Sequence, residues 1–185
     1  MKIVIVTDIF GLCESIDNLI RHLAHYMINP VVIEPYQGIR YNFLSEQDAY
    51  EAFIEKCGHD KYLSLVSKSL SIEKPELIIG FSAGASAVWR VSNLDNLECR
   101  GAICFYPAQI RNHLDIKPKI PLKVVFPCTE SAFDVLDISN RVSSYENVNT
   151  DITPFQHGFM NNRSAAYDLS GEMYGLKLIE MNISS

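Results

Sequence analysis

Short apolar runs alternate along this chain with longer segments of helical periodicity, and this alternation restricts the possible folds most. The first run, KIVIVT at residues 2–7, is continuous and β-branched, as is typical of a strand buried on both faces. Similar runs occupy residues 31–34, 77–81, 101–106, 122–126 and, more weakly, 148–153. Helical segments are expected at about 15–27, 45–72 with a break at Gly58, 83–91, 131–145 and 164–181. Strands separated by helices join through right-handed crossovers, so the sequence predicts an α/β fold, a three-layer sandwich with a mainly parallel six-stranded sheet.

Composition and charge exclude several classes of protein. The 185 residues, 48% hydrophobic and 21% charged, suit one globular domain that spans residues 1–185. A net charge of -6 without a basic run argues against nucleic-acid binding, which needs clustered Lys and Arg. No apolar stretch approaches the roughly 20 residues of a membrane span, so we expect no membrane partner either.

The cysteines and histidines indicate a cytoplasmic protein without a metal. The five cysteines are scattered and form no C-x-x-C pair, as expected for reduced thiols. The N-terminal apolar run is short and is interrupted by Asp8, unlike a signal peptide. His22 and His25 could share a face of the first predicted helix, but no third ligand accompanies them. We therefore expect a cytoplasmic location and neither a metal ion nor an organic cofactor.

The residues that follow the predicted strands carry the chemistry. In parallel α/β sheets, ligands bind beyond the carboxyl ends of the strands. Ser82 follows the third predicted strand, Glu130 the fifth and His157 the sixth. A serine, an acid and a histidine in this chain order match the nucleophile, the orienting acid and the base of a hydrolase triad.

Ser82 lies in GFSAG, which fits the G-x-S-x-G pattern of a nucleophile elbow. The pattern follows an apolar strand and opens a helix, which is the setting that an elbow requires. A serine on such a sharp turn is strained, and small neighbours let the strand and the helix pass closely. The alternative is a plain strand-to-helix turn with Ser82 as the helix cap. The context favours the nucleophile.

A serine hydroxyl needs a base, and the base needs an acid that orients it. His157 is the best placed of the histidines, because it lies in a polar turn after the last strand. Glu130 is the predicted acid. Asp134, four residues later, is the alternative, although an exposed position at the start of a helix suits Asp134 better.

An oxyanion hole needs two backbone N–H donors. One is expected from Ala83, directly after the nucleophile, and the other from Ile9 or Phe10 in the loop after the first strand. Asp8 lies at the same edge of the sheet. Its carboxylate is expected to hydrogen-bond Ser82 or the elbow, unless it only caps the turn into the following helix.

Four motifs, in this order, resemble the dienelactone hydrolase family of α/β-hydrolases. IVIVTDIFG resembles the first-strand signature of that family, and EPYQGIRYNF resembles the loop that follows. GFSAG resembles its elbow, and FQHGFMN resembles its histidine turn. The resemblance extends over residues 1 to about 165 and therefore covers most of the chain.

The resemblance implies a minimal α/β-hydrolase fold that lacks the first two strands, which are antiparallel in the family. The six parallel strands would then follow the order 2-1-3-4-5-6. It also implies that Ser82, Glu130 and His157 are catalytic, with Ile9 and Ala83 as oxyanion donors. The namesake enzymes have cysteine and usually aspartate where this chain has Ser82 and Glu130, so dienelactone itself is not the expected substrate.

The resemblance further implies which residues bind the substrate. Asp8, Phe10 and Tyr36 lie in the loops that the family's motifs share. Family arginines hold a substrate carboxylate, and Arg40 lies in a comparable loop, whereas Arg163 follows the histidine in a different register. A solvated surface position is the alternative for both arginines.

The sequence thus predicts a serine hydrolase that acts on small-molecule esters, lactones or thioesters. The alternative is a catalytically inactive member of the family that serves as a binding or structural protein, as the glutamate and the missing strands would allow. A flavodoxin-like nucleotide-binding protein would have a suitable strand order, but no phosphate-binding loop such as GxxxxGK[ST] is present.

Overall fold

The computed structural model describes residues 1–183, so the last two residues of the predicted 1–185 domain lie outside the described residues. Six strands form one sheet: β1 (Ile3–Val6), β2 (Val31–Ile33), β3 (Leu77–Phe81), β4 (Gly101–Phe105), β5 (Leu122–Phe126) and β6 (Val148–Ile152). The helices are α1 (Glu14–Ala24), α2 (Glu46–Lys56), α3 (Gly58–Glu73), α4 (Ala83–Val91), the 3-10 helix η1 (Ala108–Asn112), α5 (Val135–Ser143) and α6 (Leu169–Ile183).

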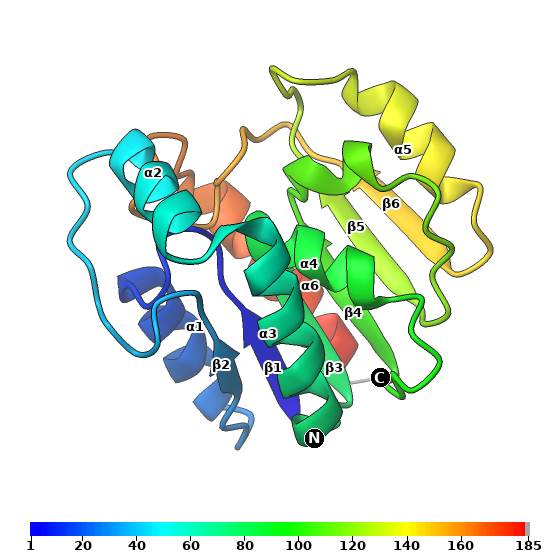
Figure 1. Ribbon diagram of the computed structural model, residues 1–185, viewed down its shortest axis with the longest axis horizontal. Coiled ribbons are helices and arrows are strands. Elements are labelled where there is room, and N and C mark those ends of the chain that lie inside the picture. Colours follow the sequence, from blue (N-terminus) through cyan, green and yellow to red (C-terminus); the bar gives the residue numbers. More distant parts are fainter. Residues whose placement is uncertain (184–185) are drawn as a thin grey trace.

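The strand order is β2-β1-β3-β4-β5-β6 and every neighbouring pair is parallel, which confirms the predicted fold class and order. All the strand arrows therefore point the same way (Figure 1). The register aligns the carboxyl ends of the central strands, with Phe81 opposite Phe105 and Phe105 opposite Val125. The loops after β3, β4, β5 and β6 consequently meet at one edge of the sheet.

Each face of the sheet is covered by its own group of helices. Val4 and Val6 face the side that packs against α3, α4 and α5, and Ile3 and Ile5 face the side that packs against α1 and α6. Figure 1 shows α3 and α4 in front of the sheet and α6 behind it. The alternation follows from the two-residue period of a strand, and a fully buried side chain of this kind contributes about 1.5–3 kcal/mol of transfer free energy.

Two helices start later than the sequence predicts, because a capping aspartate comes later. α5 was expected from residue 131 but begins at Val135, where the carboxylate of Asp134 accepts a hydrogen bond from the backbone N–H of Asp137. α6 was expected from residue 164 but begins at Leu169, where Asp168 accepts from Gly171 N at 2.9 Å. Residues 161–167 form turns, and η1 after β4 was not predicted at all.

The glycines in α6 have a packing reason. A Cβ on Gly171 would lie 2.7 Å from the ring of Phe159, and one on Gly175 would lie 2.2 Å from the sulfur of Met160. The absence of these side chains lets α6 press against the segment that follows His157. Among residues 1–183, no helix combines the length and the apolar character that a membrane crossing demands.

Candidate active site

A chain of two hydrogen bonds joins Ser82, His157 and Glu130. Ser82 Oγ lies 2.9 Å from His157 Nε2, and His157 Nδ1 lies 2.6 Å from Glu130 Oε1. The three side chains come from the loops after β3, β6 and β5, as the sequence predicts. Side-chain exposure is 10% for Glu130 and 32% for His157, so the acid is shielded and the imidazole faces solvent. Both distances fall in the range expected for a nucleophile, its base and the group that orients the base.

Ser82 has a strained backbone. Its φ of 47° and ψ of -109° lie where an L side chain is disfavoured, and the surrounding structure must hold it there. Ser82 N donates to the carbonyl oxygen of Phe105 at 2.9 Å, which ties the turn to β4. The N–H and the hydroxyl of Ser86 both donate to the carbonyl oxygen of Ser82, each at 2.9 Å. These contacts hold the hydroxyl at the strand-to-helix turn, as in a nucleophile elbow.

Gly84 brings α4 against the end of β1. A Cβ at this position would lie 2.3 Å from the carbonyl oxygen of Thr7 and 2.4 Å from that of Val6, both of them backbone atoms of the sheet. A Cβ on Gly80 would lie 2.8 Å from the backbone of Ala85. Both glycines of the G-x-S-x-G pattern are therefore required by close backbone contacts, which is the role that the pattern suggested.

The two candidate acids have different places. Glu130 lies in the loop after β5, which is joined to the histidine loop by a backbone hydrogen bond from Cys128 N to Phe155 O at 2.7 Å. Asp134 Oδ1 accepts from Asp137 N at 2.9 Å and caps α5. The carboxylate of Glu130, not that of Asp134, therefore contacts the imidazole. Asp134 lies at the start of a helix, the place that suited it better in the sequence.

The loop after β1 offers one of its two expected oxyanion donors. Phe10 N donates to Asp8 Oδ1 at 2.9 Å, so the N–H of Phe10 is used within the loop. Ile9 stays the candidate, and its own carbonyl oxygen accepts from the hydroxyl of Tyr36 at 2.5 Å. Ala83 is the first residue of α4, so its N–H has no acceptor within the helix and is suited to bind an oxyanion.

Asp8 connects the loop after β1 to the loop after β6 instead of contacting Ser82. Its side chain is buried, and Oδ2 accepts from Asn161 Nδ2 at 2.7 Å. Burial raises the pKa of Asp8 to about 6, although the hydrogen bonds from Asn161 and Phe10 act in the opposite direction. The expectation that Asp8 binds Ser82 or the substrate is thus replaced by a structural role between two loops.

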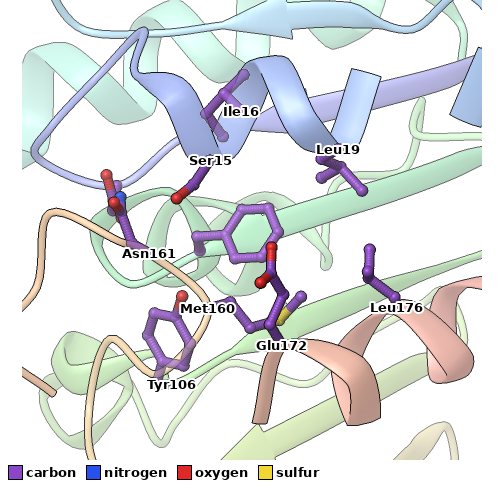
Figure 2. A pocket seen from close by; sticks show the side chains of 10 residues that line it. Ser15, Ile16, Leu19, Tyr106, Met160, Asn161, Glu172 and Leu176 are labelled. Carbon is purple, nitrogen blue, oxygen red and sulfur yellow. The ribbon is translucent and has the colours of Figure 1, made fainter. Parts of the chain in front are cut away.

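Asn161 and Tyr106 were not identified from the sequence. Asn161 stands in FQHGFMN, where only the histidine was interpreted, and its partner Asp8 is 153 residues away. The ring of Tyr106 lies 5.0 Å from that of His157 and packs the imidazole from one side. Figure 2 shows both residues at a small cavity of about 20 Å³, together with Ser15 of α1 and Glu172 of α6.

The predicted substrate ligands Arg40, Arg163 and Tyr36 all bind protein groups. Arg40 forms two hydrogen bonds with the carboxylate of Asp17, at 2.7 and 2.8 Å. Arg163 donates to Asn42 Oδ1 and to the carbonyl oxygen of Phe43, both at 2.7 Å. Tyr36 is buried, and its hydroxyl donates to the carbonyl oxygen of Ile9 in the loop after β1. Both guanidinium groups therefore bind protein groups outside the Ser82–His157 pair; Arg40 is exposed, whereas Arg163 is half-buried.

A metal is not indicated by the side chains. Among residues 1–183, no cluster of three or more His, Cys, Asp or Glu side chains is arranged to hold a metal ion.

Comparison with known proteins supports the fold of the chain. No family model matches it. The uncharacterised protein YczH of Bacillus subtilis (strain 168) is 25% identical over 175 residues, covering 90% of this chain and 84% of YczH. The match with YczH extends over most of both chains.

Solved structures of α/β-hydrolases resemble it closely in three dimensions. A candidate dienelactone hydrolase from Klebsiella pneumoniae subsp. pneumoniae has a TM-score of 0.71 at 16% identity, over 96% of this chain and 84% of the other. Est1E from Butyrivibrio proteoclasticus, solved with ferulic acid, has a TM-score of 0.65 at 12% identity, over 100% of this chain and 90% of the other. An α/β-superfamily structure from Xanthomonas campestris pv. campestris scores 0.65 at 9% identity, over 97% of both chains. The chain thus has the α/β-hydrolase fold of dienelactone hydrolase-like proteins.

Proposed function

We propose that this chain is a serine hydrolase that cleaves small ester, lactone or thioester bonds. The observation that carries the proposal is the hydrogen-bond chain from Ser82 through His157 to Glu130, with links of 2.9 and 2.6 Å. The strained backbone of Ser82 supports it, because strain of this kind concentrates at functional sites. The α/β-hydrolase and esterase structures that share the fold are consistent with ester chemistry.

Acylation starts with proton transfer. The Nδ1–H group of His157 donates a hydrogen bond to the carboxylate of Glu130, so the neutral imidazole keeps its proton on Nδ1 and its Nε2 can accept the proton of the Ser82 hydroxyl. Ser82 Oγ then attacks the carbonyl carbon of the substrate. The N–H groups of Ala83 and Ile9 stabilise the oxyanion, and Glu130 stabilises the imidazolium.

The imidazolium next gives its proton to the leaving alcohol or thiol, and an acyl group stays on Ser82. A water molecule, deprotonated by His157, attacks this acyl-enzyme. Collapse of the second oxyanion releases the acid and returns the proton to Ser82. Each proton that His157 accepts is thus passed on within the same half-reaction.

The form of the chain favours small substrates. The longest connections at the catalytic edge, residues 34–45 and 153–168, are joined to each other by the hydrogen bonds of Arg163 with Asn42 and Phe43, so neither stands apart as a lid. All five cysteines are free thiols, which fits the expected cytoplasmic location. We propose small-molecule esters, lactones or thioesters rather than long-chain lipids as the substrates.

A fluorophosphonate probe tests the nucleophile. The native protein and a Ser71→Ala control, which removes an exposed hydroxyl on α3, should both be labelled. Ser82→Ala should not be labelled and should lose hydrolysis of a small chromogenic ester. Labelling of Ser82→Ala equal to that of the native protein, or no labelling of either, would contradict the proposal. The second result would favour the binding-protein alternative.

A further inference from the structure

A second cavity lies next to the turn that carries Ser82, between α4, α3 and η1. It has a volume of about 110 Å³ and lies among the start of α3, the outer side of α4 and η1. Its basic walls are His59 from α3, Arg90 from α4 and His113 directly after η1. None of these three residues takes part in the hydrolysis described above.

The floor of this cavity is continuous with the catalytic turn. Ala83, the proposed oxyanion donor, and Ser86 both line it. Ser86 Oγ donates to the carbonyl oxygen of Ser82 at 2.9 Å and accepts from Gln109 N at 3.2 Å. Small side chains along this part of α4 leave the space open. A group bound here would therefore lie next to the backbone that holds Ser82.

Three basic side chains and one carboxylate, that of Asp60, line this cavity. The Nε2 atom of His59 is buried and has no hydrogen-bond partner among the described residues. Arg90 has a side-chain exposure of 19% and donates to the carboxylate of Asp60, whose own side chain is 90% exposed. So exposed a carboxylate is well screened by water and compensates the buried guanidinium poorly. In a chain of net charge -6, this concentration of basic groups is a local exception.

We propose that this cavity binds a phosphate group. Phosphate offers several strong acceptor oxygens, and the basic residues that line the cavity come from α3, from α4 and from the end of η1, which suits a tetrahedral anion better than a planar one. Arg90 uses one N–H on Asp60, so other donors of its guanidinium are free to bind an oxyanion. His59 Nε2 supplies a second donor once protonated or in the appropriate tautomer.

The phosphate has two possible sources with the same chemistry. One source is free inorganic phosphate, which would act as an effector beside the elbow; the other is an ester that carries a phosphate and whose carbonyl reaches Ser82. The second case rests on the proposed hydrolase function, whereas binding of free phosphate does not. The experiments below separate the two.

The surroundings of the histidines predict how binding depends on pH. His59 is influenced by Asp60 on its own helix, by Arg90 on α4, and by Arg111 and His113 at η1. Burial, and then the positive charge of Arg90, lower the pKa of His59. A bound dianion would favour the protonated imidazole and raise this pKa. The histidines should accordingly take up protons when a dianion binds, and the affinity for an anion that stays a dianion should fall as the pH rises.

The same reasoning holds for His113. Burial and Arg90 lower its pKa, while Asp115 and Asp60 act in the opposite direction. Two histidines that become protonated together with phosphate binding give a signal that can be followed without any enzyme assay.

Titration of the native chain with inorganic phosphate tests the site directly. The imidazole NMR signals of His59 and His113 should shift, and calorimetry with sulfate, which stays a dianion over this range, should show tighter binding at about pH 6 than at about pH 8. Arg90→Gln should weaken binding about tenfold or more, because one charge-assisted donor is lost. His59→Gln is a second variant that keeps the site falsifiable if Arg90→Gln unfolds. Arg141→Gln, an exposed substitution on α5, is the control and should leave binding unchanged.

Three outcomes would overturn the proposal: no shift of either imidazole signal, equal binding to native protein and Arg90→Gln, or an equal response to acetate. Competition by inorganic phosphate, with a preference for an ester that carries a phosphate over its neutral analogue, would identify the substrate as the source. Binding without competition and without that preference would identify free phosphate. Failure of all ester hydrolysis would contradict the hydrolase proposal and would leave the NMR titration intact.

Discussion

Replacement of Asp8 by asparagine should change the pH dependence of folding in a way that the structure makes calculable. The buried carboxyl has its pKa raised from 3.8 to about 6 by loss of solvation. One pKa unit corresponds to about 1.4 kcal/mol, so the ionised form is disfavoured in the folded state by about 3 kcal/mol. Because the folded pKa is raised above the unfolded one, this penalty is absent at low pH and grows as the pH rises through that interval.

The variant loses the titrating group and also part of the hydrogen bonding. An asparagine at this position can still accept from Phe10 N through its Oδ1 atom. The side-chain amide nitrogen of the new asparagine would face Nδ2 of Asn161, and two donors cannot pair. Asn161 cannot turn its amide over to help, because its Oδ1 already accepts from Arg163 N at 2.9 Å. The lost hydrogen bond costs about 1 kcal/mol. We therefore expect Asp8→Asn to be less stable than the native protein by about 1 kcal/mol near pH 3 and more stable by about 2 kcal/mol near pH 7.

Urea unfolding of both proteins across this pH range measures the difference. Other carboxyl groups titrate as well, but they are common to both proteins and cancel in the comparison. Asp17→Asn is the control of opposite sign, because the hydrogen bonds from Arg40 lower the pKa of Asp17. The stability that Asp17 supplies is present at neutral pH and is lost on acidification. Parallel stability curves for native protein and Asp8→Asn would refute the reasoning.

Two further substitutions test the catalytic acid and the elbow. Glu130→Gln should lower kcat by about 10³- to 10⁴-fold, because a neutral amide neither holds the tautomer of His157 nor stabilises the imidazolium; Asp134→Asn, which keeps a good cap on α5, should leave kcat within about twofold. An equal loss of kcat for ester hydrolysis in Glu130→Gln and Asp134→Asn would reject Glu130 as the acid. Gly84→Ala should destabilise the fold by about 1–3 kcal/mol, since its Cβ would lie 2.3 Å from the carbonyl oxygen of Thr7. An unchanged melting temperature would show that α4 can move away from β1.

The arrangement of the sheet was predictable because its signals are local. A continuous apolar strand, a helical stripe and a right-handed crossover are properties of short segments, and β3, α4 and β5 begin and end where the sequence predicts. The starts of α5 and α6 were less predictable, because each depends on which of several polar residues adopts the capping conformation. Their capping aspartates, Asp134 and Asp168, are visible in the sequence only as two acids among many.

The order of serine, acid and histidine at the strand ends came from the sequence alone, since a parallel sheet brings every such loop to the same edge. Their catalytic roles stay a proposal, but their proximity is a property of the structure. Only the tertiary structure showed that Glu130 and not Asp134 contacts His157, and that Phe10 and Arg40 already have partners.

The link between Asp8 and Asn161, and the basic cavity beside the elbow, likewise depend on residues that are far apart in the chain. Periodicity indicates which face of an element is buried, but not which distant side chain lies opposite a given atom. That choice requires the packed molecule, in which α3, α4 and η1 approach one another. The sequence pattern thus determined the parallel sheet and the strand ends at which the candidate site lies. Packing determined which side chains meet there.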